Sequence, residues 1–174
     1  CYVVHRQHSR EVSIQTIKEF LDRLLAFLSG FRVSIHLAGG ELFLKRKVVD
    51  FMEYLLEKGV YLSLVSNGLY IPSSFFKSKT IAQASTQGRF CFNISIDGLK
   101  EAHESARRDF ETVNGNLLKL LEMGIYVIVR TTLHRKNIKG IEDFFRYLNR
   151  VGSQYGRKIE INVQPVVDYQ FKRV

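Results

Sequence analysis

Two short glycine-containing motifs follow predicted strands and carry groups that could bind a ligand. Gly39-Gly40-Glu41 comes after one β-rich run, and Ser66-Asn67-Gly68 comes after the next. Glycine lets the backbone approach a ligand closely, and a carboxylate can accept a hydrogen bond from an ammonium group. Each motif alone is also compatible with a simple turn. Their position favours binding, because ligand sites in α/β proteins lie at the carboxyl ends of strands.

Two further segments add polar groups of the same kind. Ser95-Ile96-Asp97-Gly98 ends a third β-rich run, with His103 and Arg107 downstream. Arg130 lies on a fourth, which leads to Asn137 at the predicted start of a helix, where asparagine is a good N-cap. Arginine can bind a carboxylate through two parallel hydrogen bonds. We therefore expect these strand ends to contribute to one site.

The elements that position these motifs repeat one unit: an amphipathic helix, a glycine and a short β-rich run. Apolar residues at three- and four-residue steps predict helices over 13–28, 48–55, 113–121 and 138–148, and a shorter helix over 75–84. Strands are predicted at 33–38, 60–66, 90–97, 125–132 and 159–164. This alternation implies βαβ units and a parallel sheet, wound into a barrel or a doubly wound sheet.

The predicted strands alternate polar and apolar residues, unlike parallel strands that are buried on both faces. The apolar face must meet the helices, so the polar side chains should point together into a ligand-filled lumen. An open sheet with one solvated face is the alternative. The predicted lumen residues are His36, Asn93, Ser95, Asp97, Arg130, Asn162 and Gln164, of which His36, Asn93, Asn162 and Gln164 are candidates for substrate contact.

Composition limits the class of protein. The chain has 174 residues, 45% of them hydrophobic, no apolar run long enough to span a bilayer, and a formal charge of +9. Two cysteines are too few for a disulfide framework, so a reducing, cytoplasmic setting is expected. The chain opens on Cys1 without an initiator methionine and stops soon after a predicted strand, so we expect both ends to be cuts through a longer protein.

Basic clusters follow the predicted strand ends, where they would ring the mouth of a barrel. They are Arg6 and Arg10, Lys45-Arg46-Lys47, Arg107-Arg108, and Arg135-Lys136. A positive rim would attract an acidic peptide or protein segment, with nucleic acid as a weaker expectation. Scattered solubilising charge explains the same clusters without a partner.

The order of these motifs resembles the radical S-adenosylmethionine (SAM) superfamily, in particular its peptide-modifying and sulfatase-maturing branch. The resemblance runs from Cys1 to about Gln164 and rests on Gly-Gly-Glu, Ser-Asn-Gly, and Ser-Ile-Asp-Gly with a downstream His and Arg. It implies a partial TIM-like (β/α)6 barrel that lacks its first strand here, with residues 1–174 forming an incomplete core domain. Cys1, followed by Tyr2, would be the last cysteine of a CxxxCxxC loop that binds a [4Fe–4S] cluster.

The resemblance also implies a mechanism and a set of site residues. The cluster would bind SAM and cleave it reductively, with an external electron donor, to a 5′-deoxyadenosyl radical that abstracts hydrogen from the substrate. Gly39, Gly40 and Glu41 would hold the SAM amino group, and Ser95 and Arg130 its carboxylate or ribose. Asp97 would shape the strand end, and Ser66 and Asn67 complete the implied cofactor-binding set.

Some residues depart from the family pattern or fit another function. Leu42 replaces the usual proline, and Cys1 is the only cluster cysteine present, so this segment alone should not hold an intact cluster. Cys91 lies too far along its strand to replace a missing ligand, and we expect it to be a small core residue. A non-redox barrel enzyme on a phosphorylated or sugar substrate would use Glu41, Asp97 and His36 for acid–base chemistry. A degenerate barrel serving as a binding module is the third hypothesis.

Overall fold

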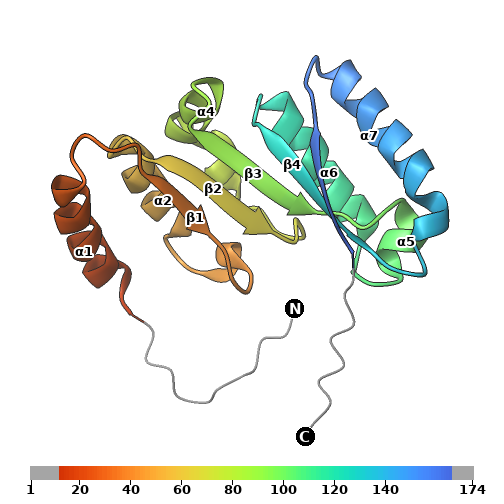
Figure 1. Ribbon diagram of the computed structural model, residues 1–174, viewed down its shortest axis with the longest axis horizontal. Coiled ribbons are helices and arrows are strands. Elements are labelled where there is room, and N and C mark those ends of the chain that lie inside the picture. The colour runs from red at the N-terminus through yellow and green to blue at the C-terminus, as the bar shows by residue number, and fades with distance from the viewer. Residues whose placement is uncertain (1–11, 166–174) are drawn as a thin grey trace, which may run out of the picture.

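The computed structural model describes residues 12–165, which form one parallel sheet of five strands backed by helices (Figure 1). The strands follow one another across the sheet in chain order: β1 Ser34–Leu37, β2 Tyr61–Ser66, β3 Phe90–Ser95, β4 Val127–Leu133 and β5 Glu160–Pro165. This order is that of a partial TIM-like barrel, so the predicted fold class is confirmed.

Helices alternate with the strands as the periodicity predicts. They are α1 Ile14–Phe27, α2 Val48–Glu57, α3 Ser73–Lys77, α4 Lys79–Thr86, α5 Lys100–Glu104, α6 Phe110–Glu122 and α7 Ile141–Gln154, with short 3-10 turns η1 Leu42–Leu44 and η2 Ile138–Gly140. Their apolar sides share one core with the strands, in which Leu64 on β2, Phe92 on β3 and Val129 on β4 are fully buried. The helices therefore cover one face of the sheet.

The opposite face carries the polar half of each alternation, as predicted. Along β3, for example, Phe92 and Ile94 are buried, whereas Asn93 and Ser95 are only half-buried. Since β1 and β5 each pair on one side only within the described residues, this polar face lines an open trough rather than a closed lumen.

Two predicted helix boundaries were wrong. Residues 75–84 form parts of two helices, because Ser78 interrupts the first and caps α4 by accepting the Ile81 N–H at 3.1 Å. The last helix continues to Gln154, past its predicted end at residue 148, so Gly152 lies inside it. A Cβ on Gly152 would lie 2.6 Å from the Arg157 carbonyl oxygen, so glycine is needed there for close packing rather than for ending the helix.

The core role predicted for Cys91 was also wrong. It is half-buried on the polar face of β3, where it lines a small pocket of about 150 Å³ together with His36 and Tyr126. Burial, with a smaller contribution from the Glu160 carboxylate, raises the pKa of the Cys91 thiol to about 11. The thiol therefore stays protonated at neutral pH, which makes it a poor nucleophile or metal ligand.

Candidate functional site

A pocket of about 440 Å³ lies at the carboxyl ends of the strands, on the polar side of the sheet. Seven of the residues predicted for cofactor or substrate contact line it, and the loops after β1 and β2 and the ends of β3, β4 and β5 bring them together. These residues are Gly39, Gly40, Ser66, Asn67, Ser95, Arg130 and Gln164.

Arginine side chains give this pocket its charge. Arg130 lies beside Ser95 in the register of β3 and β4, and Arg107 lines the same pocket from the loop after α5. Two guanidinium groups at one pocket suit a carboxylate ligand, since each can offer paired N–H donors. Arg107 was not among the predicted cofactor residues, although its position ten residues after Asp97 was part of the family pattern.

Glu41 ties the first two motifs to each other instead of lining the pocket. Its Oε1 accepts a hydrogen bond from Ser66 Oγ at 2.9 Å, and its Oε2 accepts one from the Asn67 backbone N–H at 3.0 Å. These are charge-assisted hydrogen bonds between segments about 25 residues apart in the chain. Glu41 therefore holds the loop after β1 against the turn after β2.

The turn at Gly68 is fixed by packing as well as by hydrogen bonds. Gly68 has a φ of +75°, and a Cβ there would lie 2.7 Å from Ile94 Cδ1. Its N–H donates to Ser66 Oγ at 3.0 Å, and its carbonyl accepts from Asn116 Nδ2 at 2.8 Å. The Ser-Asn-Gly motif thus needs glycine both for its backbone conformation and for space.

Asp97 is almost fully buried, and the protein itself occupies both of its carboxylate oxygens. Oδ2 accepts from Arg107 Nε at 2.6 Å, and Oδ1 accepts from the Thr132 backbone N–H at 2.8 Å. The Asp97 backbone N–H donates to His103 Nδ1 at 3.3 Å, and its carbonyl accepts from Asn137 Nδ2 at 2.7 Å. Asp97 therefore positions Arg107 beside the pocket and joins the ends of β3 and β4.

His103 and Asn137 complete this buried cluster. His103 is fully buried, and burial is the main reason that its pKa is lowered, so the imidazole is neutral at neutral pH. Asn137 lies at the predicted helix start, but the expectation that its side chain caps the helix was wrong. Its Nδ2 donates to the carbonyls of Asp97 and Thr132, while its Oδ1 accepts from the His134 N–H at 2.9 Å.

The remaining predicted substrate residues lie on the same polar face but outside this pocket. His36 lines the smaller pocket beside Cys91, Asn93 Nδ2 donates to Ser63 Oγ at 3.1 Å, and Asn162 is exposed next to Arg130 in the sheet register. Since Glu41 and Asp97 are both bound to protein donors and His36 belongs to the other pocket, the acid–base alternative lacks a converging set of groups.

The predicted cluster ligand, Cys1, lies outside the described residues. Within residues 12–165 no group of three or more His, Cys, Asp or Glu side chains could hold a metal ion. In the same part of the chain, no helix has the length and apolar character needed to cross a bilayer.

Comparison with known proteins shows similarity in both sequence and fold. No family model matches the sequence. The chain is 26% identical over 153 residues to Fe-coproporphyrin III synthase of Methanosarcina barkeri, an alignment that covers 85% of this chain and 36% of that protein.

Two solved structures share the fold. The anSMEcpe structure with bound AdoMet and Kp18Cys peptide superposes with a TM-score of 0.72 at 19% identity, covering 97% of this chain and 47% of that one. SuiB of Streptococcus suis bound to S-adenosylmethionine gives a TM-score of 0.70 at 12% identity, covering 98% and 38%. The chain thus spans less than half the length of these relatives. The resemblance seen in the motifs is confirmed by the fold, since this chain has the partial-barrel fold of radical SAM enzymes.

Proposed function

We propose that residues 1–174 form the core domain of a radical SAM enzyme, with SAM bound in the 440 Å³ pocket at the strand ends. The observation that carries the proposal is the meeting of two arginines with two glycine-containing loops at this pocket. SAM presents a carboxylate and an ammonium group together. The arginines suit the carboxylate, and the glycine-containing loops suit the ammonium group.

The residues present fit this ligand. Arg130 and Arg107 would bind the carboxylate, and Ser95 would donate to the carboxylate or ribose. Gly39 and Gly40 have φ values of +108° and +47°, and no atom lies within 4 Å of where their Cβ atoms would be. The backbone of this loop is therefore open to a ligand from the side that a side chain would otherwise cover.

The remaining groups of the site would orient the ligand. Asn67 would contact polar atoms of SAM, and Ser66 would stabilise the turn that carries Asn67. Gln164, predicted for substrate contact, lines the same pocket and would contact SAM as well. Glu41, predicted to hold the SAM amino group, would act by holding the two loops together, so that Gly39 and Gly40 stay beside the ligand. Asp97 would act through Arg107 rather than by touching the ligand.

Cys1 would provide one ligand of a [4Fe–4S] cluster, and the other two cysteines would come from sequence outside this chain. When bound, SAM and the cluster would supply radical chemistry, in which one electron from an external donor breaks the C5′–S bond of SAM and gives methionine and a 5′-deoxyadenosyl radical. The protein would contribute orientation of SAM and of the substrate on the polar face of the sheet. His36, Asn93 and Asn162, which lie farther along the polar trough, would contact the substrate.

The proposed substrate is an acidic peptide or protein segment in the cytoplasm. Support comes from the basic loops at the strand ends, where Lys45-Arg46-Lys47 follows β1, Arg107-Arg108 follows β3 and Arg135-Lys136 follows β4. Positive charge at the mouth of a pocket raises the local concentration of an acidic substrate. One of the structures with this fold holds both AdoMet and a peptide, which agrees with a peptide as the substrate class.

The test is anaerobic reconstitution of the intact protein with iron and sulfide, followed by an assay for 5′-deoxyadenosine from SAM and a reductant. We expect bound iron and deoxyadenosine formation. Arg130→Met should weaken SAM binding about tenfold or more, since a charge-assisted pair is lost, whereas Arg135→Met should leave SAM binding unchanged. A protein that binds neither iron nor SAM after reconstitution would refute the proposal.

A further inference from the structure

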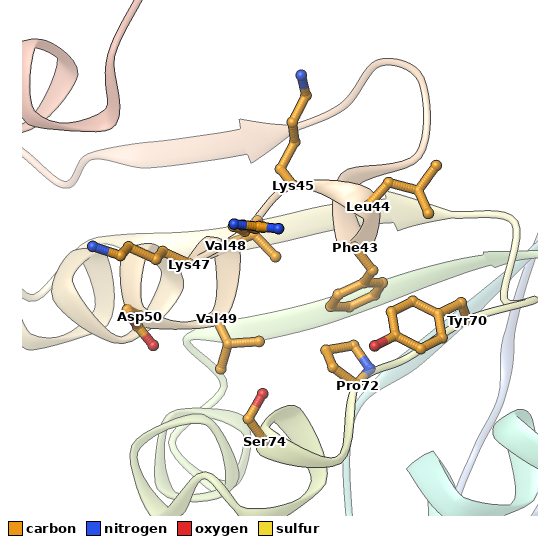
Figure 2. Close-up of a pocket in the computed structure, with 11 residues that line it drawn as sticks. Phe43, Leu44, Lys45, Lys47, Val48, Val49, Asp50, Tyr70, Pro72 and Ser74 are labelled. Carbon is orange, nitrogen blue, oxygen red and sulfur yellow. The ribbon is translucent and has the colours of Figure 1, made fainter.

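A second hollow of about 400 Å³ is lined by residues that follow the two loops joined by Glu41. Figure 2 shows it between the start of α2 and the segment that leads from β2 to α3. Its lining begins with Phe43, two residues after Glu41, and includes Tyr70, three residues after Asn67. The hollow is therefore built by segments that directly follow the two loops of the proposed SAM pocket.

Apolar side chains form the base of this hollow. Phe43 is buried and packs edge-to-face on Phe75, with ring centroids 5.6 Å apart, so its position is fixed by the core. Leu44 and Tyr70 are 73% and 52% exposed, and Pro72 lies beside the Tyr70 ring in Figure 2. Two large exposed apolar side chains at one hollow mark a surface suited to an apolar group of a partner.

Basic side chains border the same hollow. Lys45, Arg46 and Lys47 are consecutive, exposed and among its lining residues. Within residues 12–165, Arg46 and Lys47 form no ion pair. Asp50 also lines the hollow, in the first turn of α2, where its carboxylate is favoured by the helix dipole. The net charge around the hollow is therefore positive.

We propose that this hollow docks an acidic peptide segment, with an aliphatic or aromatic side chain placed against Leu44 and Tyr70 and flanking carboxylates placed near Lys45-Arg46-Lys47. This inference rests on the proposed function and identifies where its peptide substrate is held outside the trough. Docking here would anchor the substrate on the loops that carry Gly39, Gly40 and Ser66.

The observations favour a peptide over nucleic acid. A nucleic-acid strand needs a row of cations that follows successive phosphates. Here the cations are one run of three residues beside a compact apolar hollow, and Asp50 would repel a phosphate near it. A peptide carries apolar side chains and carboxylates close together, which matches this arrangement.

The test measures fluorescence anisotropy of a labelled peptide in which glutamates flank a single leucine, added to the intact protein. Arg46→Glu/Lys47→Glu should weaken binding about tenfold at low salt, and the difference should largely disappear near about 0.5 M salt, because exposed charges are screened. Lys77→Glu/Lys79→Glu makes the same charge change on α3 and α4, outside the hollow, and should weaken binding less than about threefold.

Tyr70→Ser tests the apolar half and remains informative if the charge-reversed protein does not fold. It should weaken binding of the leucine peptide about fivefold, and should have no effect on a peptide with serine in place of leucine. Equal effects of the two charge-reversed proteins would overturn the proposal. Stronger binding of an oligothymidylate of equal charge would also overturn it, in favour of a nucleic-acid surface.

These measurements need no cluster, SAM or reductant, so they separate the docking site from the proposed chemistry. A protein that fails the deoxyadenosine assay but binds the peptide at this hollow would refute the proposed function alone. A protein that forms deoxyadenosine but shows no effect of these substitutions on peptide binding would refute the docking site alone.

Discussion

Replacing Asp97 with asparagine tests whether its carboxylate joins the ends of β3 and β4 and holds Arg107 at the pocket. Asparagine keeps the shape and one acceptor oxygen, so the hydrogen bond from the Thr132 N–H can survive. The ion pair with Arg107 at 2.6 Å is lost, and the amide group can point N–H donors at the guanidinium. The substitution therefore removes charge with little change in volume.

The size of the effect follows from burial. The Asp97 side chain is 3% exposed and that of Arg107 is 30% exposed, so the pair is shielded from water on the carboxylate side. Hydrogen bonds to charged groups contribute about 1.5–3 kcal/mol, and breaking a fully buried pair costs about 3–5 kcal/mol. Because Arg107 can still reach solvent, we expect Asp97→Asn to lower the free energy of unfolding by about 2 kcal/mol.

Urea denaturation of the wild-type and variant proteins measures this loss, and titration with SAM measures the effect on Arg107. Glu111→Gln is the matched control, since it also converts a carboxylate to an amide in an ion pair, with Lys100 at 3.2 Å, but both of its groups are exposed. That control should change the free energy of unfolding by less than about 0.5 kcal/mol. If Asp97→Asn were no more destabilising than Glu111→Gln, the assigned role of Asp97 would be wrong.

Three further predictions follow from other contacts. Glu41→Gln should lower the free energy of unfolding by about 1–2 kcal/mol and weaken SAM binding, because one amide oxygen cannot replace both carboxylate acceptors. Urea denaturation would measure the stability and calorimetry the SAM binding. Unchanged values would refute the role of Glu41 in joining the two loops. Cys91 should react slowly with iodoacetamide at about pH 8, because its pKa is raised to about 11 by burial and by Glu160. Glu160→Gln should therefore speed that reaction, measured by peptide mapping. Because the pKa of His103 is lowered in the folded protein, the unfolded state binds a proton at this side chain more readily. The free energy of unfolding should therefore be highest above about pH 6.5 and should fall as the pH drops below it. His103→Gln should flatten this dependence in thermal unfolding.

Much of the fold could be predicted from the sequence because its signals are local. The alternation of polar and apolar residues along β3 and the apolar stripes of α1 and α6 depend only on near neighbours in the chain. The order of strands and helices then leaves a parallel sheet with short crossovers as the expected arrangement. The boundaries that failed depend on details that the spacing of apolar residues does not show. Ser78 caps α4 through the Ile81 N–H, and Gly152 lets the Arg157 carbonyl approach closely.

The candidate site shows the same division. The sequence indicated that Glu41, Asp97 and Arg130 stand at strand ends, and hence near one another. Only the tertiary structure decided which of them face the pocket, because both carboxylates are taken up by donors 10 to 35 residues away in the chain. The sequence around a carboxylate does not show whether its oxygens bind a ligand or a backbone N–H. Its role is fixed by which donors the fold brings within hydrogen-bond distance, and that is a property of long-range packing.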